Sequence, residues 1–164
     1  MKSVFLLSTA LAGLLAGTAT AETISRSELV MAVSACQSAL PVFDGVIRKR
    51  PLAVQNEGSS SSFITCGLEG VFGATPHSTS IAIGFINHGA AAVTVNCTLV
   101  DGRNLLTDPI YLPASSSVPA GGTSSITWSP DGESFIYPAI SCNLPPNAGI
   151  RYVGRTFNEE IGGR

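Results

Sequence analysis

The sequence predicts an all-β fold, an antiparallel β-sandwich of about seven short strands. Apolar and polar residues alternate with a period of two in several short segments, most clearly from Val93 to Val100. Clusters of Gly, Pro, Asn, Asp and Ser separate these segments, as expected for turns. Charged residues make up only 12% of the chain, about half the usual quarter. Such a neutral, hydroxyl-rich composition favours strands over amphipathic helices.

The expected elements follow one another closely in the second half of the chain. Asp101-Gly102 and Pro130-Asp131-Gly132 have the composition of turns, and Pro145-Pro146 ends a strand. Residues 103–122 are expected to form a loop with one short strand inside it, and Ile150–Val153 a last edge strand. The other predicted strands are Ile81–Asn87, Val93–Val100, Ile110–Leu112, Ser124–Trp128 and Phe135–Asn143.

One segment carries a family resemblance. The stretch VPAGGTSSITW, from Val118 to Trp128, resembles the turn-then-strand segments of immunoglobulin-like domains. The resemblance implies a sandwich of immunoglobulin-like type. It is short and generic, so it implies nothing about function.

The first 21 residues have the layout of a secretory signal peptide. Lys2 supplies the positive charge, Val4–Ala16 is an apolar stretch, and Ala19-Thr20-Ala21 fits a cleavage site. The apolar stretch is too short for a membrane anchor. We therefore expect cleavage after Ala21, a single disulfide-stapled domain over residues 22–164, and a secreted or periplasmic protein that does not span a membrane.

The start of the expected domain has two interpretations. Ser25–Glu28 has the form of a capping box, and apolar residues follow at helical spacing as far as Pro41, which predicts a short N-terminal helix. A strand through Leu29–Val33 is the alternative. The apolar residues at helical spacing are Leu29, Val33, Cys36 and Leu40.

The four cysteines predict two disulfides, because their number is even and the expected compartment is oxidising. Cys97 and Cys142 share the inward parity of their strands, so we expect them to pair, which leaves Cys36 for Cys66. The wide spacing argues against a zinc site, and no catalytic partner accompanies Cys97. Asn96-Cys97-Thr98 matches a glycosylation acceptor, but its mid-strand position favours ordinary strand sequence.

An internal repeat relates two segments at an offset of 31 residues. Both VQNEGSSSSFITCGL and FINHGAAAVTVNCTL contain Asn-x-Gly, then seven residues, then Cys-x-Leu. We interpret each copy as a β-hairpin, in which a strand ends at the Asn and the Gly adopts a positive φ in the turn. The aligned pairs are Asn56 with Asn87, Gly58 with Gly89, Cys66 with Cys97, and Leu68 with Leu99.

Candidate binding residues are few. Arg48-Lys49-Arg50 is the only basic run, either a solvated turn before a strand that begins at Pro51 or a contact for an acidic glycan or lipid headgroup. His77 and His88 lack a third ligand partner and are expected on the surface.

The aromatic residues divide into two groups. Trp128 shares the parity of Ile126 and is expected in the core. Phe135 and Tyr137 have the outward parity of their predicted strand, and Tyr111 and Tyr152 are expected near sheet edges. These four would either cover loops and edges or form an exposed strip that stacks on sugar rings.

No recognised motif for hydrolysis, metal catalysis or phosphate binding occurs in the chain. With the signal peptide removed, eight basic and eleven acidic residues remain, a net charge of −3 that argues against nucleic-acid binding. We therefore expect a non-enzymatic structural or protein-interaction module without a cofactor, with a protein or glycan partner in the envelope or outside the cell. The alternatives are a carbohydrate- or small-ligand-binding module and an inhibitor of a secreted hydrolase.

Overall fold

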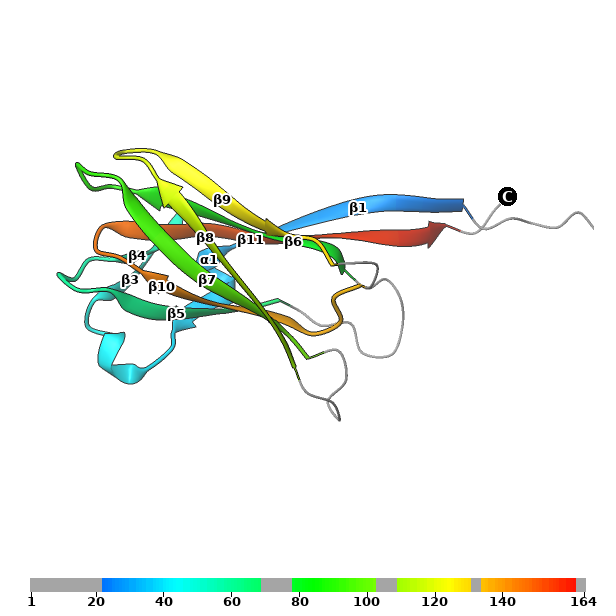
Figure 1. Ribbon diagram of the computed structural model, residues 1–164, viewed down its shortest axis with the longest axis horizontal. Helices are drawn as coiled ribbons and strands as arrows, with labels where there is room; N and C mark the ends of the chain where they lie inside the picture. Colours follow the sequence, from blue (N-terminus) through cyan, green and yellow to red (C-terminus); the bar gives the residue numbers. More distant parts are fainter. Residues whose placement is uncertain (1–21, 69–77, 103–108, 131–133, 162–164) are drawn as a thin grey trace, which may run out of the picture.

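The computed structural model describes residues 22–68, 78–102, 109–130 and 134–161 (Figure 1). The expected signal peptide, His77 and the turn residues Asp131 and Gly132 lie outside these ranges. Within them the chain forms two antiparallel sheets, one short α-helix and one 3-10 turn, which confirms the predicted β-sandwich.

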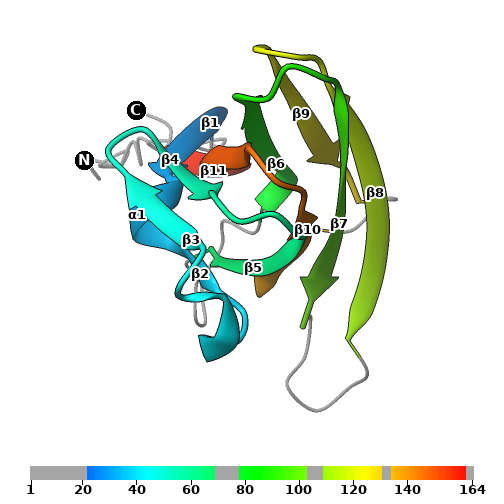
Figure 2. The same cartoon turned by 90° about the vertical axis from the view of Figure 1, so that its left-hand side faces the viewer.

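Sheet A contains six strands and sheet B five. In sheet A the order is β3, β4, β11, β6, β9, and β1 pairs with β11; in sheet B it is β2, β5, β10, β7, β8. Figure 2 shows the two layers from one end. The bounds of sheet A are β1 Glu22–Met31, β3 Ile47–Arg50, β4 Ala53–Asn56, β6 Ser78–Asn87, β9 Thr123–Trp128 and β11 Ala148–Ile161, and those of sheet B are β2 Cys36–Ser38, β5 Ser62–Gly67, β7 Val93–Asp101, β8 Ile110–Val118 and β10 Pro138–Leu144.

The strand order is that of a jelly roll. From β4 onward, β4, β6, β9 and β11 belong to sheet A, and β5, β7, β8 and β10 to sheet B. Four of the connections between the sheets are short, β4–β5, β6–β7, β8–β9 and β10–β11, and these gather at one end of the sandwich (Figure 1). The eleven described strands exceed the predicted number of about seven mainly because β1, β2 and β3 add to the eight strands of the jelly roll, at the sheet edges and beside β11.

The core lies between the sheets and is built from the inward half of each strand. In β7 the residues Val95, Cys97 and Leu99 are buried, as their alternation predicts. Trp128 is buried and its Nε1 donates to the Leu112 carbonyl at 2.9 Å, so it links the two sheets. This confirms the predicted core position of Trp128.

The two copies of the internal repeat form equivalent connections between the sheets, not hairpins. β4 and β6 lie in sheet A, whereas β5 and β7 lie in sheet B. The positive φ expected at Gly58 and Gly89 is also wrong, since Gly121 is the glycine with a positive φ in the described part of the chain. A Cβ on Gly58 would stand 2.9 Å from the Val46 Cβ, and one on Gly89 3.0 Å from the Asn87 Oδ1. Close approach, not backbone conformation, is what favours glycine at both positions.

Several element predictions need correction at the two ends of the domain. The strand alternative, Leu29–Val33, is right for Leu29–Met31, which end the longer strand β1. It is wrong for Ala32 and Val33, which belong to the four-residue α1, Ala32–Ala35, the only helix described in this part of the chain. β11 is a long central strand rather than a short edge strand, because β6 covers one of its sides and β4 and β1 share the other. The loop expected over residues 103–122 contains all of β8.

Candidate functional site

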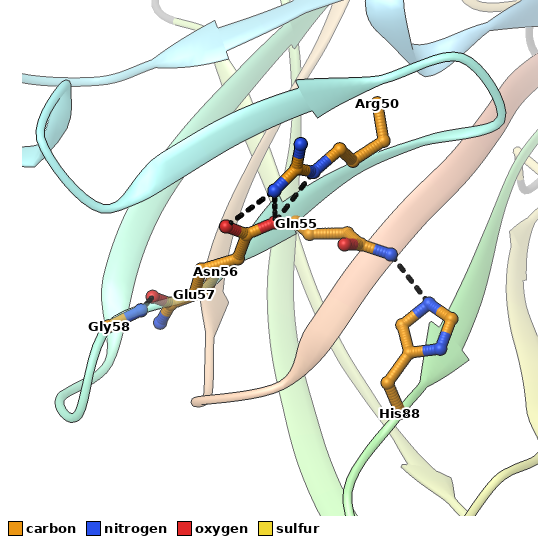
Figure 3. Close-up of polar contacts among 6 residues, drawn as sticks. All are labelled: Arg50, Gln55, Asn56, Glu57, Gly58 and His88. Atoms are coloured by element: carbon orange, nitrogen blue, oxygen red, sulfur yellow. Dashed lines mark hydrogen bonds and ion pairs between the residues drawn. The ribbon is translucent and has the colours of Figure 1, made fainter.

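The basic run lies within β3, not in a turn before a strand. Side chains alternate along a strand, so the three residues do not share one face. Lys49 donates from Nζ to the Val33 carbonyl at 3.1 Å, on the side of α1. Arg50 forms a two-pronged ion pair with Glu57, with distances of 2.7 and 2.8 Å (Figure 3). Arg48 takes part in neither contact, and an anion contact by the whole run stays a prediction.

His88 lies beside β4 on the outer side of sheet A. Gln55 Nε2 donates to His88 Nε2 (Figure 3). The two residues border an apolar depression of about 470 Å³ that also contains Leu52, Ile86 and Arg151. No group of three or more residues suited to hold a metal ion occurs in the described part of the chain.

Both predicted disulfides are present, Cys36–Cys66 and Cys97–Cys142. Each joins neighbouring strands of sheet B at directly opposed positions, β2 with β5 and β7 with β10. All four cysteines are buried. The disulfides therefore stiffen sheet B itself and do not connect the two sheets.

Of the four aromatic residues expected either to cover loops and edges or to form an exposed strip, Phe135 does not face outward. Phe135 is buried, and its backbone pairs with Ser78 instead of continuing β10. Its outward parity was inferred for a strand from residue 135, but β10 begins at Pro138. The buried Asp101 side chain accepts the backbone N–H groups of Ile136 and Tyr137, both at 3.0 Å, which holds this segment apart from the strand.

Two exposed aromatic residues lie on the outer face of sheet B. Phe63 on β5 is 47% exposed and Tyr111 on β8 is 63% exposed. Tyr111 confirms the expectation of an aromatic residue at a sheet edge, since β8 is the last strand of its sheet. Phe63 was missed, although it has the parity opposite to the inward Ile64 and Cys66.

Between these aromatic residues the outer face carries amides and hydroxyls. The strand register places Phe63, Asn143, Asn96 and Ser115 in one row across four strands. The adjacent row contains Thr65, Ser141, Thr98 and Pro113. Asn96, the asparagine of the glycosylation pattern, is thus exposed in the middle of this face.

An open, shallow depression of about 520 Å³ occupies this part of the face. None of its described lining residues is charged. Its size falls within the usual range for small-ligand sites. The lining residues are Phe63, Asn96, Cys97, Thr98, Pro113, Ala114, Ser115, Ser141 and Asn143.

Asn143 has a side-chain oxygen without a partner. Its Oδ1 is buried and accepts no hydrogen bond within the described structure. Leaving such an acceptor unpaired costs about 1–3 kcal/mol. Asn143 lies directly between Phe63 and Asn96 in the row and lines the depression, while its Oδ1 is itself closed to solvent.

None of the helices that the structure describes has the length and apolar character of a membrane span. No protein family and no curated protein matches the sequence.

Solved structures resemble the chain only in fold. An exo-β-1,3-galactanase from Phanerochaete chrysosporium matches with a TM-score of 0.43 and 12% identity over 79% of this chain and 29% of its own. A family 11 carbohydrate-binding module from Clostridium thermocellum matches with a TM-score of 0.38 and 12% identity, over 91% of this chain and 92% of its own. A carbohydrate-binding module of the β-sandwich superfamily matches with a TM-score of 0.40 and 12% identity, over 85% of this chain and 55% of its own. The chain thus spans less than a third of the galactanase.

Proposed function

We propose that this protein binds a neutral glycan on the outer face of sheet B. The observation that carries the proposal is an uncharged open depression in which an exposed Phe63 lies beside the unpaired Asn143 Oδ1. This corresponds to the carbohydrate-binding alternative drawn from the sequence, rather than to its main hypothesis of a structural or protein-interaction module.

The chemistry of the face suits a sugar chain. The apolar side of a pyranose packs on an aromatic ring, and Phe63 offers such a ring at the rim. Amide and hydroxyl side chains both donate and accept, as sugar hydroxyls do, and Asn96, Thr98 and Ser141 supply them in adjacent rows. Rotation of the Asn143 side chain toward the depression would let a sugar hydroxyl donate to Oδ1 and satisfy the unpaired acceptor.

The same residues favour binding over catalysis. General acid–base chemistry needs ionisable side chains that converge on the substrate, and the described lining of the depression has none. A lining without charge also favours a neutral sugar over an acidic one, because no cation compensates a desolvated carboxylate.

A glycan array followed by isothermal titration calorimetry tests the proposal. We expect Phe63→Ala to weaken binding about tenfold through the lost aromatic contact. Leu52→Ala is the matched control, because Leu52 is an exposed apolar residue on sheet A, 70% exposed. Equal affinities of the two variants for the bound glycan would contradict the proposed site.

An exposed apolar loop suggests a second candidate function, docking on another protein. The segment from Ala39 to Val46 projects Leu40 and Val42, 54% and 75% exposed, close to the Cys36–Cys66 disulfide. Backbone hydrogen bonds from Phe43 to Leu40 and from Val46 to Phe43 hold its shape. An exposed, fixed apolar loop beside a disulfide is suited to docking on a protein, including a secreted hydrolase. Loss of partner capture in Val42→Ser, with glycan binding intact, would favour this function.

The expected location is consistent with both candidates. Two disulfides fit a secreted or periplasmic protein, since they persist in oxidising compartments. Cleavage after Ala21 remains part of the proposal. N-terminal sequencing of the exported protein tests it, with Glu22 as the expected first residue.

A further inference from the structure

The outer edge of β1 is a long strand edge with no partner strand in the described structure. β1 pairs with β11 over its whole length, from Glu22 opposite Ile161 to Met31 opposite Tyr152, without a register shift. Figure 1 shows the two strands as a ribbon that projects from the sandwich. The backbone groups on the other side of β1 are therefore free to pair with another strand.

β1 has few of the features that usually protect a sheet edge, although it contains the charged residues Glu22, Arg26 and Glu28. Native edges are typically short, bulged or marked by proline or lysine. β3 is short and basic, β2 has three residues, and β8 contains Pro113. By contrast, β1 has neither proline nor lysine, and it exposes Leu29, Val30 and Met31 by 70%, 41% and 41%. An edge of this kind is expected to be covered by another strand.

A second copy of β1 complements this edge in one register. When two identical antiparallel strands are related by a two-fold axis normal to the sheet, facing residues must have the same parity. Two such registers keep almost the full strand paired. Centring on Arg26 sets Arg26 against itself, whereas centring on Ser27 sets Arg26 against Glu28. Like charges directly opposite each other destabilise a strand pair and opposite charges stabilise it, so the register on Ser27 is favoured.

The register on Ser27 also extends an existing row of charges. Within one chain Arg26 pairs with Glu159 and Glu28 with Arg155, each at 2.8 Å. The side chains of Arg26 and Glu28 remain 52% and 50% exposed, so each can accept a second neighbour. Val30 would face Ile24 of the second copy on the same side of the sheet.

We propose that two copies of this chain associate through antiparallel pairing of their β1 edges, with Ser27 at the two-fold axis and two reciprocal Arg26–Glu28 ion pairs. Sheet A then continues from one copy into the other. The proposal is independent of the glycan site, which lies on sheet B.

Variants that reverse the charge of Arg26 or Glu28 test the ion pairs, with sedimentation velocity as the measurement. The protein should carry no N-terminal tag, because β1 begins at Glu22 and a tag would adjoin it. The native protein is expected to dimerise with rising concentration. R26E and E28R should each raise the dimer dissociation constant about tenfold, because both ion pairs become like-charge pairs. An equimolar mixture of the two variants should regain association, since the acidic pair of one variant then faces the basic pair of the other. A native protein that stays monomeric, or a mixture no better than either variant, would overturn the proposal.

Cysteine crosslinking tests the register. S27C should form a disulfide-linked dimer under mild oxidation, because the two positions face each other at the axis within disulfide reach. S25C is the matched control on the same side of β1, and it should crosslink far less because it faces Leu29. Crosslinking of S25C as readily as S27C would exclude this register.

Discussion

Asn56 and Asn87, at equivalent positions of the internal repeat, make the same hydrogen bonds at two crossings between the sheets. In each, Oδ1 accepts the backbone N–H two residues later, from Gly58 at 2.9 Å and Gly89 at 2.8 Å. In each, Nδ2 donates to the carbonyl four residues later, Ser60 or Ala91, at 2.8 Å. Both side chains are fully buried.

The same amides also connect the two sheets. Asn56 Nδ2 donates to the carbonyl of Leu144, at the end of β10. Asn87 Nδ2 donates to the carbonyl of Val118, at the end of β8. Each asparagine thus fixes its own turn and ties sheet A to sheet B, which explains why the repeat keeps Asn and Gly at this spacing.

Replacement of either asparagine should destabilise the fold. We expect Asn56→Ala and Asn87→Ala each to lower the free energy of unfolding by about 2–3 kcal/mol, because buried backbone groups lose their partners. Urea unfolding measures the change, and Asn158→Ala, at an exposed position of β11, is the control. If Asn87→Ala behaves like Asn158→Ala, the amide does not hold the crossing.

Replacement of Asn143 should weaken glycan binding without destabilising the fold. Asn143→Leu removes an unpaired buried oxygen, so the free energy of unfolding should stay the same or rise by about 1 kcal/mol. Glycan affinity should fall about tenfold when the acceptor is lost. Denaturation and calorimetry on the same variant check both results. A large loss of stability would instead assign the amide a structural role.

The disulfides should behave as single units. Cys97→Ser and Cys142→Ser should each cost about 3–4 kcal/mol of stability, and the double variant little more, because one substitution already removes the bond. The described chain has no free cysteine, and Cys97 is 3% exposed. Thiol alkylation of the native protein should therefore label no cysteine. Stoichiometric labelling of Cys97 without denaturant would contradict this structural role.

Within the basic run, Arg48 should account for most of any anion binding. Arg50 is paired with Glu57, and Lys49 with the Val33 carbonyl. Arg48→Ser should weaken binding of an anionic glycan more at low salt than at high salt, because exposed charges are screened by ions. Lys49→Ser is the control. A loss that is the same at all ionic strengths would indicate packing instead.

The alternation of apolar and polar residues predicted the parts of the fold in which a strand buries one face. It placed Cys97 and Cys142 on the same side and paired them correctly, and it put Trp128 in the core. It failed where a side chain interrupts the ladder, as where Asp101 binds the backbone of residues 136 and 137 and Phe135 turns inward. Such a contact joins residues distant in sequence, so a local pattern does not predict it.

The topology and the candidate site could not be predicted from local patterns, because both depend on pairing between strands that are distant in sequence. The repeat was visible, but a local pattern does not distinguish a hairpin from a crossing between sheets, because both read as strand, turn, strand. The outward parity of Phe63 and Asn143 was already present in the sequence. Their assembly into one row depends on the pairing of β5 with β10, which only the structure supplies.

Nuclear magnetic resonance titration with the glycan selected on the array tests whether the outer face of sheet B binds the glycan. We expect the amide shifts to change at Phe63, Asn143, Asn96 and Thr98 on the outer face of sheet B, and we expect Phe63→Ala to remove the changes. Shift changes confined to the outer face of sheet A, around Leu52 and Arg151, would contradict it.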